Sequence, residues 1–333
     1  MSEGKTNLPT IRKRSAAGGA LTLKEGKWPP LIIRAGTAAQ ERFLEFFTAT
    51  IRNKNTRMAY FRAISRFMAW ADERHLSLED IRPIHVATYI EGFTAGLADP
   101  SVKQHLAAIK MLFDWMVTGQ IVPANPAASV RGPKHVVKKG KTPVLTAEEA
   151  RKLLESITTE TVVGLRDRAL IATMLYSFAR VSAVVGMRVQ DYYPQGKRSW
   201  LRLHEKGGKF HEVPCHHKAD EYLEAYLEAA KIKDQPKTPL FRSTRGRTAQ
   251  LTEKALTRVD AFRIVQRRAK QVGLLGRICN HSFRATGITV YLENGGELET
   301  AARIAAHESP RTTKLYDRTA DNITLEEIER IRF

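Results

Sequence analysis

The sequence predicts a mainly α-helical protein of two domains, the second of which also contains a small β-sheet. Its 333 residues exceed what one hydrophobic core usually organises. Apolar residues recur at helical spacing in two long regions, separated by a stretch rich in proline and lysine. We therefore expect a flexible basic arm over residues 1–36, a helical domain over 37–120, a linker over 121–143 and a second domain over 144–333.

The arm mixes lysine, arginine, glycine, serine and proline and includes the basic run Arg12-Lys13-Arg14. Such a composition buries too little apolar surface to fold alone. Two interpretations stay open: the arm lies along the phosphates of a nucleic acid, or it is a disordered leader.

The region from Ala38 to Thr118 has the apolar spacing of four helices, with breaks at residues 53–55, 77–83 and 92–100. Basic side chains punctuate these helices. They form either a solvated helix face or contacts to phosphates, and the charge of the whole chain favours phosphate contacts. The candidates are Arg57, Arg62, Lys103, His105 and Lys110, with Lys138 and Lys139 in the linker.

The second domain opens at Thr146, which can form a capping box with Glu149. Two strand-like segments, residues 199–204 and 210–213, flank the glycine-containing turn Glu205-Lys206-Gly207-Gly208-Lys209 and predict a hairpin. Helices are expected at residues 164–178, 182–187, 219–231, 257–272, 281–293, 299–306 and 325–332.

Charge indicates the class of partner. The chain has 54 Lys and Arg against 35 Asp and Glu, a formal net charge of +19, which attracts polyanions. No run of about 18 uncharged apolar residues suggests a membrane span, and the basic N-terminus lacks the apolar core of a signal peptide. We therefore expect a cytoplasmic protein that binds double-stranded DNA and no membrane.

The two cysteines, Cys215 and Cys279, cannot form a disulfide framework, and no Cys/His cluster has the spacing of a zinc site. We interpret both as small buried thiols in a reducing cytoplasm. The segment from Lys206 to Lys209 lacks the spacing of a phosphate-binding loop. We expect no metal and no cofactor.

Six residues of the second domain, taken in order, indicate phosphate chemistry. Each alone has an ordinary explanation: a surface arginine, a polar pair one helical turn apart, or a packed tyrosine. Their joint occurrence on so basic a chain makes the ordinary explanations poor ones. The set is Arg180, Lys206, His281, Arg284, His307 and Tyr316.

This ordered set resembles the signature of the tyrosine recombinases, or phage integrase family, which includes the Xer-type recombinases. The resemblance runs from about Ala38 to the end and includes weaker features at Asn55 to Tyr60 and at Asn125-Pro126-Ala127. It implies a four-helix, SAM-like DNA-binding domain followed by an α-rich catalytic domain with a small β-sheet. The implied function is site-specific recombination through a 3′-phosphotyrosine intermediate, in integration, excision or resolution.

The resemblance implies a role for each of the six residues. Tyr316 is the nucleophile, and its phenol, with an ordinary pKa of about 10, needs help to lose its proton. Arg180 and Arg284 would clamp the non-bridging oxygens of the phosphate, because planar guanidiniums bind such oxygens in pairs.

The remaining three residues move or share protons. His281 resembles the general base that takes the proton of the tyrosine, and Lys206 resembles the general acid that protonates the leaving 5′-oxygen. His307 would add a hydrogen bond to the phosphate or to the leaving oxygen.

Two positions depart from the family pattern. An acidic residue usually stands three positions after the first arginine, where this chain has Ala183, so the support of the active-site arginine and histidine is missing or comes from elsewhere. The residue before the second histidine is usually glycine and is Ala306 here. Neither change removes one of the six residues, and we still expect activity.

The resemblance also implies an assembly. The chain is expected to clamp duplex DNA in a C shape and to act as a tetramer on paired sites, with copies of itself or with a related recombinase. The predicted helix over residues 325–332 has an apolar face and is too short to be stable alone. It packs either on its own domain or on a neighbouring protomer.

Three other functions fit parts of the pattern. A type IB topoisomerase shares the chemistry but needs no paired sites. A catalytically silent DNA-binding regulator is conceivable because of Ala183. A structural nucleoid-type protein would bind DNA without a defined site. The sequence leaves open the target site, the accessory factors and the direction of the reaction.

Overall fold

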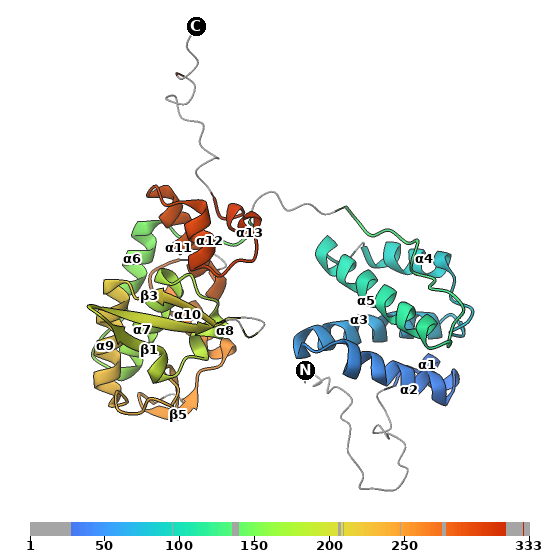
Figure 1. The fold of residues 1–333 in the computed structure, drawn as a ribbon, viewed down its shortest axis with the longest axis horizontal. Coiled ribbons are helices and arrows are strands. Elements are labelled where there is room, and N and C mark those ends of the chain that lie inside the picture. The colour runs from blue at the N-terminus through green and yellow to red at the C-terminus, as the bar shows by residue number, and fades with distance from the viewer. Residues whose placement is uncertain are drawn as a thin grey trace. The chain divides into compact units, whose positions relative to one another are not determined.

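The computed structural model describes residues 28–94, 96–134, 140–205, 208, 210–246, 248–274, 278–317 and 329. The chain divides into two compact units, Met1–Val136 and Val137–Phe333 (Figure 1). The division falls inside the linker expected at residues 121–143. The fold is mainly helical with small sheets, as the sequence predicts.

The first unit is entirely helical among its described residues. Its four longer helices correspond to those expected between Ala38 and Thr118, and a turn of π-helix follows the first of them. The elements are α1 (Pro30–Arg34), α2 (Thr37–Glu45), η1 (Phe46–Thr50), α3 (Lys54–Asp72), α4 (Pro83–Thr94) and α5 (Asp99–Thr118).

Helix α1 was not expected, because the sequence suggested a flexible arm as far as residue 36. Leu31 and Ile32 are 1% and 0% exposed, and the ring of Trp28 lies 5.7 Å from that of Phe43. Residues 28–36 therefore belong to the folded unit, and the expectation of an arm was wrong for them. The arm before Trp28 lies outside the described residues.

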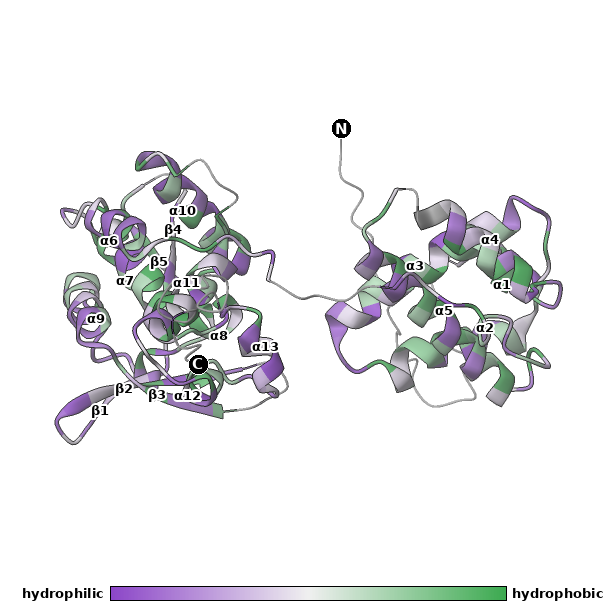
Figure 2. Ribbon diagram, turned by 90° about the horizontal axis from the view of Figure 1, so that it is seen from above, coloured by the Kyte–Doolittle hydropathy of each residue, from purple (hydrophilic) through white to green (hydrophobic). Residues whose placement is uncertain are grey.

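In the core of the first unit, α1, α4 and α5 pack against α3, and α2 packs against α1 and α5. Helix α3 begins at Asn53, whose side chain accepts hydrogen bonds from the backbone N–H groups of Asn55 and Thr56, as expected of a helix cap. Figure 2 shows hydrophobic and hydrophilic residues interspersed along the helices of both units, the pattern of amphipathic helices.

The second unit wraps helices around a central buried helix, α7, and carries a three-stranded and a two-stranded sheet (Figure 1). Strands β1, β4 and β5 and helix α13 are additions to the elements expected from the sequence. The helices are α6 (Ala147–Glu155), α7 (Val162–Tyr176), α8 (Val181–Val185), η2 (Val189–Asp191), α9 (His217–Ala230), α10 (Arg258–Gln271), α11 (Asn280–Glu293), α12 (Leu298–Ile304) and α13 (Pro310–Lys314). The strands are β1 (Tyr192–Gln195), β2 (Arg198–His204), β3 (Phe210–Pro214), β4 (Arg242–Thr244) and β5 (Leu251–Ala255).

Helix α7 is buried along most of its length, including its charged residues Arg166 and Asp167. It packs against α9 and α11. Helix α6 before it starts with the expected capping box between Thr146 and Glu149. The short segment after α7 leads to Arg180, so the position of this helix sets that of the arginine.

The three-stranded sheet is antiparallel in the order β1-β2-β3. Strands β2 and β3 form the expected hairpin, with Leu201 opposite Val213 and His204 opposite Phe210 at its end. Strand β1 was not predicted from the sequence, because it is short and contains Pro194, a residue that an edge strand tolerates.

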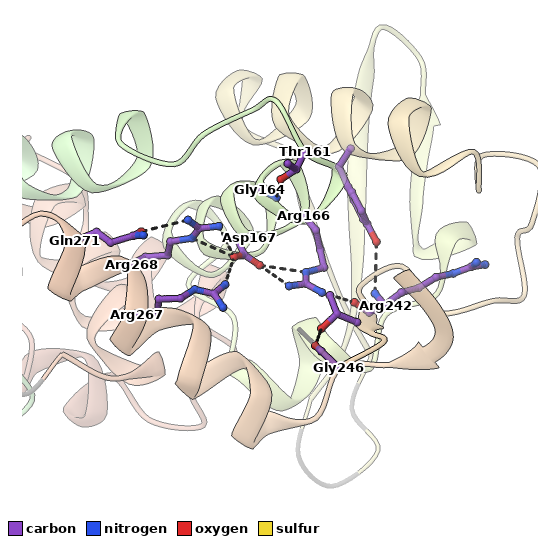
Figure 3. A network of polar contacts seen from close by, with 11 residues as sticks. Thr161, Gly164, Arg166, Asp167, Arg242, Gly246, Arg267, Arg268 and Gln271 are labelled. Atoms are coloured by element: carbon purple, nitrogen blue, oxygen red, sulfur yellow. Dashed lines mark hydrogen bonds and ion pairs between the residues drawn. The ribbon is translucent and has the colours of Figure 1, made fainter. Parts of the chain in front are cut away.

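A buried polar network ties α7 to α10 (Figure 3). The Asp167 carboxylate, 0% exposed, accepts hydrogen bonds from Arg166, Arg267 and Arg268, each with a nitrogen at 2.7 Å. Arg166 also donates to the carbonyl oxygen of Arg242 in β4 at 2.8 Å. The network fixes α7, which leads to Arg180, against the helix that precedes His281 and Arg284.

Candidate active site

The structure brings five of the six predicted residues into one site of the second unit. Arg180 directly precedes α8, His281 and Arg284 lie in the first turns of α11, His307 follows α12, and Tyr316 follows α13. Helix α11 packs against α12, which in turn packs against α13 (Figure 1). The sixth residue, Lys206, lies outside the described residues, and Glu205 before it is described.

Tyr316 is hydrogen-bonded to His281. The distance from His281 Nε2 to Tyr316 Oη is 2.7 Å, and Tyr316 is 8% exposed. Burial raises the pKa of Tyr316 against the opposing influence of Arg284 and Arg180. Burial also lowers the pKa of His281, and the same two arginines add to the effect. At neutral pH the tyrosine is therefore protonated and the histidine neutral, the states required for transfer of a proton between them.

The ring of His307 also lies near that of Tyr316. Its ring is parallel to that of Tyr316 within 6°, with centroids 5.9 Å apart, and its Nδ1 lies 2.8 Å from the hydroxyl of buried Thr313. Burial, followed by the charge of Arg284, lowers the pKa of His307 to about 3. If Thr313 donates to Nδ1, the ring proton is on Nε2, which then serves as a hydrogen-bond donor.

Arg284 is held by the backbone. It is 0% exposed and donates to the carbonyl oxygen of Phe178 and, at 2.6 Å, to that of Ala305. Burial lowers its pKa to about 10, so it keeps its charge at neutral pH. Within the described part of the chain its Nε has no hydrogen-bond partner. A buried donor without a partner is costly, and an anion that accepted a hydrogen bond from it would remove that cost.

Arg180 is more open and has an acidic partner. Its side chain is 34% exposed, and its NH1 lies 2.5 Å from Glu205 Oε2, on a side chain that is 3% exposed. Ala183, where the family has an acidic residue, is 1% exposed and lies among core residues. Glu205 was not predicted as a site residue from the sequence, where its one signal is a carboxylate directly before Lys206.

Ala306 precedes His307 in the left-handed region, with φ at +48°. The backbone N–H of His307 donates to the carbonyl oxygen of Ala302 at 2.9 Å, and that of Ala306 to Arg303 at 3.0 Å. These two bonds form the usual left-handed helix end, where glycine is favoured. The end of α12 thus places His307, and alanine does so at a conformational cost.

Of the candidate DNA-contacting residues, Arg62 and Lys103 are exposed on α3 and α5. Arg57 donates twice to the carbonyl oxygen of Ile51, at 3.0 and 2.7 Å, and Lys110 donates to that of Ala128 at 3.2 Å. His105 is half-buried and lies 3.4 Å from the Tyr89 hydroxyl. Three of the five therefore have partners inside the first unit. Lys138 and Lys139 lie outside the described residues.

Other expectations concern metals, thiols, membranes and the C-terminus. Cys215 and Cys279 are free and only partly buried, so the expectation that they are buried thiols was wrong on burial. Among the described residues no three His, Cys, Asp or Glu side chains gather as metal ligands would. No described helix is long and apolar enough to cross a membrane. The expected helix over residues 325–332 lies outside the described residues, apart from Glu329.

This chain is similar in sequence and in fold to known proteins. Residues 143–322 match the Phage integrase family, and residues 41–120 match the Phage integrase, N-terminal SAM-like domain. The tyrosine recombinase XerD of Chlorobaculum tepidum is 28% identical over 286 residues, which cover 83% of this chain and 90% of that protein.

Two solved structures share the fold at low sequence identity. The XerH site-specific recombinase in a post-cleavage complex with difH DNA has a TM-score of 0.67 at 16% identity, over 92% of this chain and 96% of that one. A lambda integrase tetramer bound to a Holliday junction has a TM-score of 0.62 at 19% identity, over 89% of this chain and 84% of that one. Since the family match spans more than half of the chain, this protein belongs to the phage integrase family, the tyrosine recombinases.

Proposed function

We propose that this tyrosine recombinase cuts and rejoins duplex DNA at a defined site through a covalent bond between Tyr316 and the 3′-phosphate. The observation that carries the proposal is the 2.7 Å hydrogen bond between Tyr316 and His281, beside two arginines. A protonated tyrosine next to a neutral histidine is a nucleophile with its base in place.

In the cleavage step, Tyr316 Oη attacks the phosphorus atom of the scissile phosphodiester. The new bond joins phosphorus to the tyrosine oxygen, and the bond from phosphorus to the 5′-oxygen breaks. His281 accepts the tyrosine proton, and Lys206 donates a proton to the leaving 5′-oxygen. The products are a 3′-phosphotyrosine and a free 5′-hydroxyl. Attack by a 5′-hydroxyl of another duplex reverses the step and completes strand exchange.

The transition state carries additional negative charge on the phosphate oxygens, and the site offers cations for it. Arg284, fixed by two carbonyl oxygens, and Arg180, which is partly open to solvent, would bind the non-bridging oxygens. His307 would donate through Nε2 to the phosphate or to the leaving oxygen. Fixed donors of this kind need no reorganisation during the reaction.

For DNA binding by the first unit, we rank the candidates by their exposure. Arg62 and Lys103 come first because their side chains are exposed. Arg57, His105 and Lys110 come second because they also contact the protein itself. Lys138 and Lys139 stay proposed on sequence grounds.

We further propose a tetramer on two paired sites in the cytoplasm, where double-stranded DNA is accessible to the chain. The fold shared with a lambda integrase that forms a tetramer on a Holliday junction supports this assembly.

The tail after Tyr316 is proposed to dock on a neighbouring protomer. Deleting the residues after Asn322 should abolish recombination and spare DNA binding by the monomer; loss of both would contradict docking in trans.

The test of the nucleophile begins with the target site. The protein is incubated with genomic DNA, covalently bound fragments are recovered under denaturing conditions, and their ends are sequenced. A nicked duplex of the recovered site then traps the adduct, because the released fragment diffuses away. We expect an adduct with the wild type and none with Tyr316→Phe. An adduct that survives this substitution would refute Tyr316 as the nucleophile.

The same materials separate the alternatives. A topoisomerase would relax a supercoiled plasmid that lacks the recovered site. A silent regulator would bind the site and form no adduct. A nucleoid-type protein would show neither a preferred site nor an adduct.

A further inference from the structure

The contact between Arg180 and Glu205 lies within the active site but joins residues 25 positions apart. Arg180 NH1 and Glu205 Oε2 are 2.5 Å apart, and Glu205 Oε1 lies 3.5 Å from the backbone N–H of Arg180. Both carboxylate oxygens thus face the same arginine. One edge of the guanidinium is held by Glu205, which leaves its other nitrogens for a phosphate.

Position 183 cannot supply this contact. The side chain of Ala183 is a buried methyl group, and its backbone N–H is used in a 2.8 Å bond to the carbonyl oxygen of Arg180. Glu205 instead approaches from the end of β2, directly after the last pair of the hairpin, His204 opposite Phe210. The paired strands fix the position of His204, the residue directly before Glu205.

The charges around Arg180 also favour a carboxylate at this place. Beyond the effect of burial, the charge of Arg180 lowers the pKa of Arg284, and the charge of Glu205 raises it. A carboxylate that is 3% exposed acts strongly at short range, because little water screens it.

We propose that Glu205 is the positioning residue of Arg180, and that it replaces in space the acidic residue that the family usually has at position 183. The carboxylate fixes the guanidinium so that its free edge meets a non-bridging oxygen of the scissile phosphate. This inference rests on the proposed role of Arg180 in cleavage. It assigns Glu205 no direct contact with DNA.

The first test measures the rate of adduct formation on the nicked duplex. Glu205→Ala and Glu205→Gln should slow it roughly 10- to 100-fold, the usual effect of removing an outer partner that orients a reactive group. Glu205→Asp should recover much of the rate. Glu212→Ala is the matched control: it breaks an ion pair with Arg202 in the same hairpin, at 2.8 Å and with side chains 36% and 44% exposed. The control should react like the wild type, and all variants should bind the duplex equally in a gel shift.

The second test asks whether Glu205 acts through Arg180. A methylphosphonate at the scissile position removes the charge that Arg180 binds, so the deficit of Glu205→Ala should shrink to within about threefold. A 5′-phosphorothiolate makes the leaving group independent of an acid, and on it the deficit should persist. If the deficit instead persisted on the methylphosphonate and shrank on the phosphorothiolate, Glu205 would act through Lys206, and the proposal would be overturned.

A wild-type rate in both Glu205→Ala and Glu205→Gln would also overturn it. In that case the adduct at Tyr316 would still form, so the proposed function would stand. If the wild type itself formed no adduct, the proposed recombinase function would be refuted instead. Thermal melting of each variant identifies those that fail to fold, and Glu205→Gln, which keeps the shape of the side chain, then decides.

Discussion

The second unit contains two clusters of arginines that differ in whether their buried nitrogens have hydrogen-bond partners. Around Asp167, three arginines converge on one carboxylate (Figure 3). All three side-chain nitrogens of Arg166 donate hydrogen bonds, two to this carboxylate and one to the carbonyl oxygen of Arg242. Around Tyr316, Arg284 has carbonyl partners and an unpartnered buried Nε, and Arg180 has an open edge. The side-chain nitrogens of buried Arg166 and Arg268 all have protein partners, whereas one buried nitrogen of Arg284 has none among the described residues.

Because of this difference, we expect the Asp167 cluster to serve stability and the Tyr316 cluster to serve function. A buried charge whose partners are all protein groups holds elements together, and removing one partner leaves the others uncompensated. A buried cation with an unused donor is costly in the free protein and is stabilised by a phosphate that accepts from it. Substitutions in the two clusters should therefore affect different measurements.

The largest expected effect on stability comes from Asp167→Ala. It leaves buried Arg166 and Arg268 without their carboxylate, and breaking a buried pair in this way costs about 3–5 kcal/mol. Urea unfolding should show the loss. Glu221→Ala is the control, since it breaks an exposed pair with Lys218 on α9 and should cost less than about 1 kcal/mol. Equal losses in the two variants would contradict a structural role for the Asp167 cluster.

Arg284→Lys should strongly slow adduct formation and leave the stability of the fold nearly unchanged. Lysine keeps the charge and can donate to the carbonyl oxygens of Phe178 and Ala305, but it lacks the planar fork that matches a phosphate. Adduct formation on the nicked duplex should fall about 10²- to 10³-fold, the usual cost of one preorganised donor. Unfolding in urea should change far less than in Asp167→Ala. A similar loss of stability would show that Arg284 is mainly structural.

These two clusters also show how far the sequence could predict the site. Arg180, His281, Arg284, His307 and Tyr316 were predicted because each belongs to a local motif in a fixed order. Glu205 was not, because its role depends on the position of a β-hairpin beside a distant helix end. Charge alone likewise could not distinguish Arg62, which is exposed, from Arg57, which is bonded to a backbone carbonyl oxygen.

The same limit applies to the fold. Long helices with clear apolar periodicity were predicted within a few residues, as α5 and α10 show. Helix α1 has a single turn and lies in a basic, proline-containing segment, and it is stabilised by tertiary contacts of Leu31 and Ile32 rather than by its own pattern. Helix α13 is similarly short.

Acid should destabilise the Tyr316 cluster, because it already has an excess of cations. Burial keeps His307 neutral in the folded protein, with a pKa of about 3, against an ordinary value of 6.5 when unfolded. The unfolded chain therefore binds a proton that the folded chain does not, and the stability present above pH 6.5 is lost as the pH falls toward 3. Between pH 7 and 5, His307→Gln should lose less stability than the wild type, by about 1 kcal/mol after allowance for solvent.

Urea unfolding at the two pH values measures this difference. The comparison uses the change within each protein, so a constant effect of the substitution cancels. Equal changes in the two proteins would mean that His307 takes up its proton as readily in the folded site as in the unfolded chain.

The smallest expected effect concerns the backbone that places His307. Ala306 holds a left-handed conformation, with φ at +48°, at the end of α12. Glycine would relieve a strain of about 1–2 kcal/mol, and its greater freedom in the unfolded chain would offset about 0.4–1 kcal/mol of that gain. Ala306→Gly should therefore stabilise the protein by roughly 0.5–1 kcal/mol in urea unfolding. Adduct formation should stay at the wild-type rate, because the two hydrogen bonds that end α12 involve only backbone atoms. A slower reaction in the stabilised variant would instead show that the strained alanine contributes to the position of His307 and hence to catalysis.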